Sequence, residues 1–272
     1  MFFLVTIILG DIMRILITGS SSGIGYSLGR QLVYNGHTVY FTARTNEELN
    51  TLKKKLRDLK IDALSFKMDI TTDDINLVDS LKIDCLICNA AVGIGGSLLY
   101  MDTEYLRQNY EVNVFSNINL IKKVYSNMEK DKIKGKIVVL SSISYMINFP
   151  FLGSYTSSKA ALSSLIKTLK RELEYLDNGI KIYLVELGAY KTGFNQVMID
   201  NKSKYLETNN KIYNNLDSIN RLQRNLFSLI ESKSFDLLNK RIINCIEKNK
   251  NTFCIRMPYI QQFLVKIYFV FH

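Results

Sequence analysis

Short apolar segments alternate with longer amphipathic segments over most of the chain, and no other sequence feature restricts the fold as much. The apolar segments are rich in β-branched residues and carry apolar side chains at successive positions, which indicates strands that are buried on both faces. Such strands are typical of a parallel sheet with helices on both sides, so the sequence predicts a single doubly wound α/β domain. The expected strands are RILIT, HTVYFT, ALSFKMD, IDCLICNA, GKIVVLSS and IKIYLVEL, and the expected helices are residues 24–35, 46–59, 73–82, 102–130 and 154–177.

The carboxyl ends of these strands are expected to form a ligand-binding edge, because ligands bind outside those ends in an open parallel sheet. The residues that end or follow the expected strands are mostly small or polar. They are Thr18-Gly19, Thr42-Ala43-Arg44, Asp69-Ile70, Asn89-Ala90-Ala91, Ser141-Ser142 and Leu187-Gly188.

A glycine-rich loop, TGSSSGIG, follows the first strand and places Gly19, Gly23 and Gly25 at the start of an expected helix. Glycines let the backbone turn sharply and approach a phosphate closely, and the amides and dipole of a helix N-terminus attract the anion. The loop therefore predicts a pyrophosphate site, although a tight turn from strand to helix would also need glycine on its own. Its spacing differs from the G-x-G-x-x-G dinucleotide motif.

The end of the second strand indicates which dinucleotide would bind. An acidic residue there would accept hydrogen bonds from the ribose 2′-hydroxyl of NAD, but no acid occurs from Val39 to Thr45. The segment offers Arg44, and a guanidinium suits the 2′-phosphate of NADP. The sequence therefore favours NADP over NAD. The alternative is that Arg44 is a solvated loop residue that stacks on adenine.

Composition excludes several other classes of protein. The formal net charge is +10, but the lysines are spread over many amphipathic segments, so we expect no nucleic-acid partner. Four cysteines without a secretory leader fit a reducing, cytoplasmic compartment. Cys85 and Cys88 have C-x-x-C spacing, yet they lie in an apolar strand and are expected to be core thiols. No metal site is expected, because His37 and His272 are the only histidines and neither lies near another soft ligand.

The two ends of the chain are apolar, and we expect one main domain at residues 14–256 between them. The extension at 1–13 is too short to span a bilayer and lacks the features of a signal peptide. It would be an appended strand or the product of an upstream start, with a peripheral membrane anchor as the less favoured alternative. The C-terminal segment at 257–272 would complete the core, cover a subunit interface or rest on a lipid surface.

Together, the segments from residue 14 to about residue 194 resemble the short-chain dehydrogenase/reductase family. The motifs that carry the resemblance occur in order. They are TGSSSGIG at 18–25, MDI at 68–70, CNAA at 88–91, Asn113 in YEVNVFSN, Ser142 in VVLSSIS and YTSSK at 155–159. The resemblance implies a Rossmann-like fold, hydride transfer between NADP(H) and a carbonyl or alcohol substrate, and a homodimer or homotetramer.

The resemblance also implies a role for each matching residue. Ser142, Tyr155 and Lys159 would be the catalytic group, and Asn113 would support a proton relay through water. Thr192 would reach the nicotinamide carboxamide. The full set of expected cofactor-binding residues is Gly19, Ser21, Ser22, Gly23, Ile24, Gly25, Arg44, Asp69, Ile70, Asn89, Ala90, Ala91, Tyr155, Lys159 and Thr192.

Two positions depart from the family pattern. The family usually has Asn-Asn-Ala-Gly after the fourth strand, whereas Cys88 and Ala91 stand at the ends of that motif here, which would reshape the cleft slightly. The family also has Pro-Gly after the sixth strand, where this chain has Leu187-Gly188. Without the proline the turn is less restricted, and this puts the placement of Thr192 in question.

The chemistry expected of Tyr155 and Lys159 follows from their separation. Residues four apart project from one face of a helix, so the two side chains can share a site. A phenol with a pKa of about 10 is a poor acid or base at neutral pH, and a nearby ammonium would lower that pKa. Ser142 would position the substrate oxygen. Each residue alone could be an ordinary packing or surface residue, and a serine hydrolase is excluded because no histidine lies near the strand ends.

The sequence therefore predicts an NADP-dependent oxidoreductase with a small-molecule carbonyl or alcohol as its substrate. Residues 188–230 would form a lid over the substrate. Apolar Met146, Ile147, Phe149 and Phe151 would wall the pocket and indicate a lipophilic substrate. The alternative is a non-catalytic nucleotide-binding regulatory or scaffold protein with the same fold, which would not need the complete catalytic group.

Overall fold

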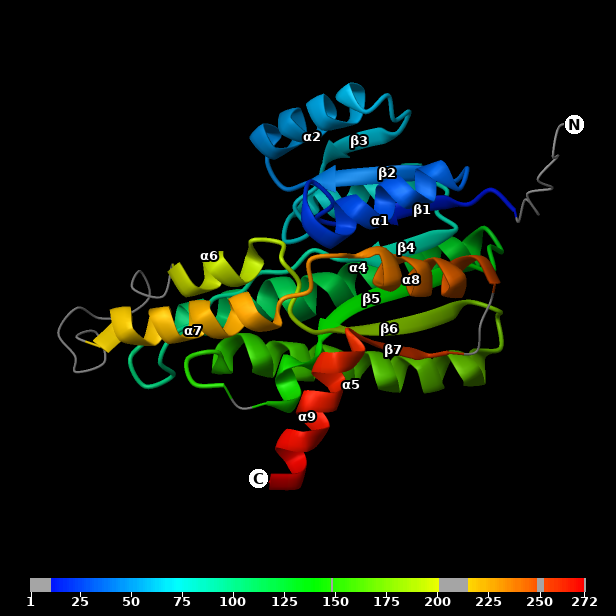
Figure 1. The fold of residues 1–272 in the computed structure, drawn as a ribbon. Helices are drawn as coiled ribbons and strands as arrows, with labels where there is room; N and C mark the ends of the chain where they lie inside the picture. Colours follow the sequence, from blue (N-terminus) through cyan, green and yellow to red (C-terminus); the bar gives the residue numbers. More distant parts are fainter. Residues whose placement is uncertain (1–10, 148, 201–214, 249–251, 272) are drawn as a thin grey trace, which may run out of the picture.

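A seven-stranded parallel sheet forms the centre of the molecule (Figure 1). The computed structural model describes residues 11–147, 149–200, 215–248 and 252–271. The strand order is β3-β2-β1-β4-β5-β6-β7, and every neighbouring pair is parallel. The strands are β1 Arg14–Ile17, β2 Thr38–Ala43, β3 Leu64–Lys67, β4 Cys85–Cys88, β5 Lys136–Ser142, β6 Lys181–Leu187 and β7 Cys254–Met257. The order reverses between β1 and β4, so a crevice for ligands is expected at their carboxyl ends.

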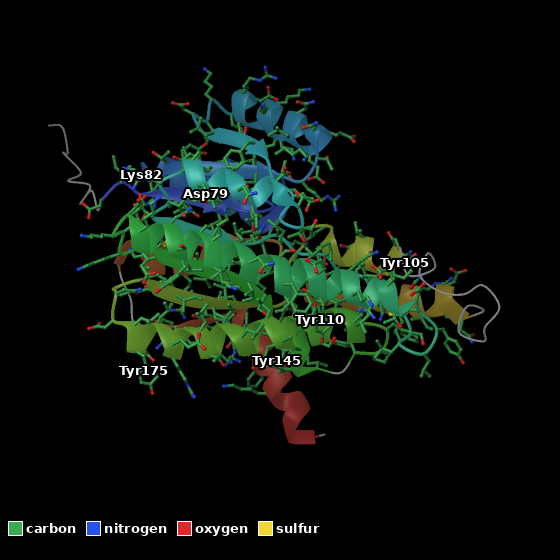
Figure 2. All side chains as sticks on the ribbon, turned by 180° about the vertical axis from the view of Figure 1, so that it is seen from behind. Asp79, Lys82, Tyr105, Tyr110, Tyr145 and Tyr175 are labelled. Carbon is green, nitrogen blue, oxygen red and sulfur yellow. The ribbon has the colours of Figure 1, made fainter. Side chains whose placement is uncertain are left out.

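Helices cover both faces of the sheet, as the sequence predicts. Ile15 and Ile17 of β1 belong to the core under α1 (Gly23–Tyr34), α2 (Asn46–Asp58) and α8 (Asp236–Lys248). Leu16, which points the other way, belongs to the core under α4 (Asn117–Lys130) and α5 (Gly153–Leu176). Figure 1 shows α1 and α8 in front of the sheet, and Figure 2 shows α4 and α5 across its back. The strands are therefore apolar on both sides because each side packs against helices.

Two predicted helices differ from expectation. The segment expected to be helical at 73–82 forms a 3₁₀ helix, η1, at Asp73–Ser80. The long helix expected at 102–130 is divided into α3 (Thr103–Tyr110), a π-helical turn η2 (Glu111–Ser116) and α4. The wider turn at η2 carries Asn113, whose side chain bonds the backbone of another loop rather than facing solvent.

Beyond β6 the chain builds a third apolar cluster outside the carboxyl ends of the strands. It packs α6 (Phe194–Asp200) and α7 (Leu216–Ile230) against Leu152. These helices occupy the region expected to form a lid, although residues 201–214 lie outside the described part of the chain. Finally, α9 (Tyr259–Phe271) follows β7 and points away from the sheet at the bottom of Figure 1.

The terminal and cysteine predictions have separate outcomes. Residues 1–10 of the N-terminal extension lie outside the described residues. Cys85 and Cys88 are free and buried in β4, and burial raises the pKa of the Cys85 thiol to about 12, so both are core thiols as predicted. Among the helices that are described, none is both long and apolar enough to cross a membrane.

Candidate active site

A cleft of about 1200 Å³ runs along the carboxyl ends of the strands. One end is formed by the glycine loop after β1 and the loops after β2 and β3. The other end is formed by β5, α5, α6 and α7, and its wall is largely apolar. The residues expected from sequence that line this cleft are Gly19, Ser22, Gly23, Ile24, Arg44, Asp69, Ile70, Asn89, Ala90, Ala91, Ser142, Tyr155, Lys159 and Thr192.

The glycine loop needs glycine for its backbone shape and for its close packing. Gly19 and Gly23 have φ values of +59° and +58°, in the left-handed region that other residues rarely adopt. A Cβ on Gly19 would lie 2.9 Å from the Cα of Ala90. At the start of α1, no side chain caps the helix. The first amides of α1 are therefore available to an anion, and the helix dipole favours negative charge at the same place.

The loop after β4 holds the glycine loop in place. The Thr18 hydroxyl accepts hydrogen bonds from the amides of Asn89 and Ala90, each at 3.0 Å. In return, the Asn89 side chain donates to the carbonyls of Thr18 and Gly19 at 2.9 and 2.8 Å. The usual family motif is changed only at its ends, and the central Asn89 and Ala90 make these contacts. The two loops at the switch point therefore form one hydrogen-bonded unit.

Two of the expected cofactor residues, Ser21 and Gly25, do not belong to the lining of the cleft. The carbonyl of Ser21 accepts a hydrogen bond from Lys55 Nζ at 3.3 Å. Gly25 is buried under Asn89, where a Cβ would lie 2.6 Å from the amide nitrogen. The absence of a side chain at Gly25 therefore lets Asn89 pack against the glycine loop.

Arg44 has a partner that sequence analysis did not identify. Its guanidinium, 61% exposed, lies 3.3 Å from Glu48 Oε1, and its backbone amide donates to Glu48 Oε2 at 3.0 Å. Glu48 also lines the cleft. The i,i+4 spacing of the two residues at the start of α2 was the available signal. A carboxylate thus lies beside the cation expected to receive a phosphate.

Ser142 and Tyr155 lie together at the apolar end of the cleft. Ser142 is the last residue of β5, and its hydroxyl accepts a bond from Ser144 N at 3.1 Å. The Tyr155 ring packs against Phe194, with ring centres 5.6 Å apart. Burial raises the pKa of Tyr155 to about 12, and a hydrogen bond with Ser142 opposes this rise only in part. The phenol is therefore protonated at neutral pH in this structure.

Lys159 lies on the same face of α5 as Tyr155, one turn further along. Its Nζ is 5.9 Å from the centre of the Tyr155 ring and donates to the Leu140 carbonyl at 3.3 Å. The side chain is almost fully buried, and burial lowers its pKa to about 8. The expected lowering of the Tyr155 pKa is not seen here, because the ammonium is itself desolvated and gives up its proton long before the phenol does.

Asn113 does not belong to the lining of the cleft, and its expected support of a proton relay through water stays a prediction. Its Oδ1 accepts from Val92 N, and its Nδ2 donates to Val92 O, each at 2.9 Å. Its Nδ2 also bonds the Ser158 hydroxyl at 3.0 Å. Asn109, one turn earlier, bonds Ile94 and Ser154 in the same way. The two amides therefore fasten α5 to the loop that lines the cleft.

Thr192 lies opposite the glycine loop even though the proline before Gly188 is missing. A Cβ on Gly23 would lie 3.3 Å from Thr192 Cγ2, so the two ends of the cleft approach each other here. The Thr192 hydroxyl accepts a hydrogen bond from the amide of Phe194, the first residue of α6, at 3.3 Å. Thr192 therefore lines the cleft without the proline that the family usually has before Gly188.

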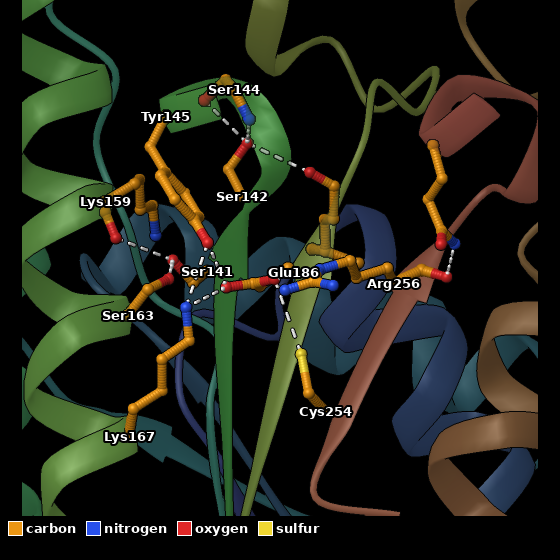
Figure 3. A network of polar contacts seen from close by, with 12 residues as sticks. Ser141, Ser142, Ser144, Tyr145, Lys159, Ser163, Lys167, Glu186, Cys254 and Arg256 are labelled. Atoms are coloured by element: carbon orange, nitrogen blue, oxygen red, sulfur yellow. Dashed lines mark hydrogen bonds and ion pairs between the residues drawn. The ribbon is translucent and has the colours of Figure 1, made fainter. Parts of the chain in front are cut away.

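Glu186 forms a buried network behind Ser142 (Figure 3). Its carboxylate has no exposed surface and accepts from Tyr145 Oη at 2.8 Å, with Lys167 Nζ at 3.3 Å and Arg256 Nε also bound. Burial alone would raise the pKa of Glu186, but the bonds from Arg256 and Tyr145 outweigh it and lower that pKa. The carboxylate is therefore ionised, and it ties β6, β7 and α5 together.

This network supports the short helix η3 (Ile143–Met146) that follows Ser142. Tyr145 belongs to η3, and the Ser142 hydroxyl lies 3.1 Å from the carbonyl of Leu187, the residue after Glu186. Of the residues expected to wall the pocket, Ile147 and Phe149 line the cleft, whereas Met146 and Phe151 do not belong to its lining.

The family model for short chain dehydrogenases matches residues 13–203. The chain belongs to the short-chain dehydrogenase family. This family consists of oxidoreductases, and the order of the motifs and of the strands agrees with it.

Two curated relatives align with about two thirds of the chain. The chain is 35% identical over 181 residues to a 3-ketodihydrosphingosine reductase of Bacteroides thetaiotaomicron, with 66% of this chain and 65% of that protein covered. It is 31% identical over 185 residues to an NADPH-dependent 3-dehydrocapnine reductase of Ornithobacterium rhinotracheale, with 65% of each chain covered. The match thus spans about two thirds of the length of these relatives.

A solved member of the family has the same fold. The structure of a short-chain dehydrogenase/reductase from Burkholderia phymatum in complex with NAD superposes with a TM-score of 0.80. It shares 19% sequence identity and covers 94% of this chain and 92% of its own. At this identity the likeness concerns the fold alone.

Proposed function

We propose that this protein is an NADP-dependent oxidoreductase that interconverts a lipophilic ketone and its alcohol. The observation that carries the proposal is the meeting of Ser142, Tyr155 and Lys159 in the wall of one cleft, whose other end is the glycine loop. A nucleotide-binding protein without turnover would have no use for a buried lysine beside a buried phenol.

The residues of the cleft fit the cofactor. The backbone of Gly19 comes too close to Ala90 for any larger residue, so the loop can cradle a pyrophosphate, and the uncapped start of α1 favours its charge. Arg44 would hold the 2′-phosphate, Lys159 the nicotinamide ribose and Thr192 the carboxamide. When bound, NADPH supplies the hydride.

The chain's own residues would handle the proton. Ser142 donates a hydrogen bond to the carbonyl oxygen and positions it beside the phenol. Tyr155 then donates its proton to that oxygen as negative charge develops there. Its pKa of about 12 keeps the phenol protonated before reaction, which suits it to act as the acid in reduction. The ammonium of Lys159 stabilises the phenolate that remains.

The substrate is proposed to be a long-chain ketone. Beside Tyr155 the cleft is lined by Phe149, Leu152, Met198, Phe227 and Ile230, which offer no charged group to a polar substrate. The names of the two relatives, reductases of 3-ketodihydrosphingosine and of 3-dehydrocapnine, support a keto-lipid of this kind. One of them is named as NADPH-dependent, which supports the cofactor.

A screen of aliphatic ketones of increasing chain length, followed by NADPH absorbance, tests this function. We expect turnover to rise with chain length, and we expect Tyr155→Phe to bind NADPH normally while turnover falls by at least about a hundredfold. Binding of NADPH without turnover of any ketone or alcohol would support the non-catalytic alternative. Unchanged turnover in Tyr155→Phe would remove Tyr155 from the mechanism.

A further inference from the structure

The turn after β6 lacks the usual proline, and a side chain from α9 holds it instead. Gln261 lies in the first turn of α9 and is only 6% exposed. Its Oε1 accepts a hydrogen bond from Ala189 N at 2.6 Å, and its Nε2 donates to Ala189 O at 3.0 Å. The amide therefore pairs with both backbone groups of one residue, as a neighbouring strand would.

The same amide also holds the end of α7. Gln261 Nε2 donates to the carbonyl of Ile230, the last residue of that helix, at 2.6 Å. The final carbonyls of a helix have no partner within it, so this bond satisfies one of them. Because the carbonyls of Ala189 and Ile230 can only accept, the orientation of the amide is determined. One side chain thus joins α7, α9 and the turn after β6.

The turn fits closely against Gln261 and faces the glycine loop on its other side. A Cβ on Gly188 would overlap Gln261 Oε1, so glycine is needed there. Gly188 N also donates to Met257 O at 2.7 Å. Four residues along, Thr192 lies against Gly23, and Gln261 itself lines the cleft. A shift of the turn away from Gln261 would therefore move Thr192.

We propose that Gln261 is a positioning residue for the cofactor, which holds the turn at 188–192 so that Thr192 faces the glycine loop. The inference rests on the proposed function, because it assumes that the cleft binds NADP(H). It also makes α9 part of the binding site, although this helix lies beyond residues 13–203, which the family model matches. Gln261 supplies through hydrogen bonds the restriction that proline would supply through its ring.

The test compares Gln261→Glu with Gln262→Ala. The first variant keeps the length of the side chain but places an oxygen, with no hydrogen to donate, against the carbonyls of Ala189 and Ile230. The second removes the neighbouring amide, which donates to Arg256 O outside the cleft. The Kd for NADPH is measured by fluorescence at a temperature at which circular dichroism shows both variants fully folded.

We expect Gln261→Glu to raise the Kd for NADPH about tenfold or more, as the loss of one to two hydrogen bonds implies. Gln262→Ala should leave this Kd unchanged. Gln261→Asn, which keeps the amide but is one methylene shorter, should give a Kd between those of Gln261→Glu and the unaltered protein. A role in stability alone would lower the unfolding temperature and leave the Kd of the folded protein unchanged.

The possible failures are distinct. If the unaltered protein binds neither NADPH nor NADH, the proposed function is wrong. If it binds NADPH and Gln261→Glu binds it equally well, only the positioning role of Gln261 is overturned. If Gln261→Glu does not fold, the same comparison is made with Gln261→Asn, and an unchanged Kd there overturns the positioning role.

Discussion

Replacing Lys159 by methionine removes a buried charge and keeps a side chain of similar length, and the structure sets the size of the effect. The ammonium lies 5.9 Å from the centre of the Tyr155 ring. At an effective dielectric constant of about 20, two unit charges about 6 Å apart interact by about 3 kcal/mol. This corresponds to about two pKa units on the phenol. While Lys159 is protonated in the unaltered protein, the variant should therefore hold about a hundredfold less phenolate at the same pH.

The assay is the oxidation of an alcohol at saturating NADP⁺, with kcat measured from about pH 6 to about pH 10, because phenolate is the base in this direction. The pKa of Lys159 is lowered to about 8, so the ammonium is present below that pH and is lost above it. The hundredfold defect of Lys159→Met should therefore appear below pH 8 and narrow at higher pH.

The control is Lys170→Met, which removes a cation of the same helix that pairs with Glu174 at the surface. This variant should follow the profile of the unaltered protein. Coincident profiles for Lys159→Met and the unaltered protein below pH 8 would refute the electrostatic reasoning. A uniform loss at all pH values would also refute it, since a charge that titrates must act over a limited range.

Three other changes address the cofactor and the buried network. Arg44→Ala should raise the Kd for NADPH about tenfold and leave that for NADH unchanged, and equal affinities in the unaltered protein would contradict the choice of NADP. Glu48→Gln should lower the Kd for NADPH by a few-fold, because Arg44 loses its competing carboxylate; a higher Kd in a fluorescence titration would count against this. Glu186→Gln should lower the free energy of unfolding by about 2 kcal/mol at pH 7. This loss is smaller than for a fully buried ion pair, because the side chains of Arg256 and Lys167 are partly exposed to solvent. Since the folded-state pKa of Glu186 lies below its ordinary value of 4.5, this stabilisation is present above that pH and is lost as the pH falls through the folded-state pKa. Urea unfolding should therefore show the difference shrinking in acid, and a constant difference would argue against the carboxylate.

Much of the candidate site could be predicted because it depends on local periodicity. Tyr155 and Lys159 share a face of α5 since they are one helical turn apart, and this holds wherever the helix packs. The glycine loop and the strand ends follow from the order of strands and helices, since a parallel sheet brings all its carboxyl ends to one edge. These features need only short-range geometry and the rule for where such sheets bind ligands.

The sequence alone determined the fold class, the glycine loop and the spacing of Tyr155 and Lys159. The tertiary structure decided that Asn113 bonds the backbone of Val92 and that Gln261 bonds the backbone of Ala189. The physical reason lies mainly in the range of the contacts. Gln261 and Ala189 are 72 residues apart in the chain, and no local pattern encodes a hydrogen bond over that separation. The desolvation that shifts the pKa values of Tyr155 and Lys159 likewise exists only once the surrounding elements have packed.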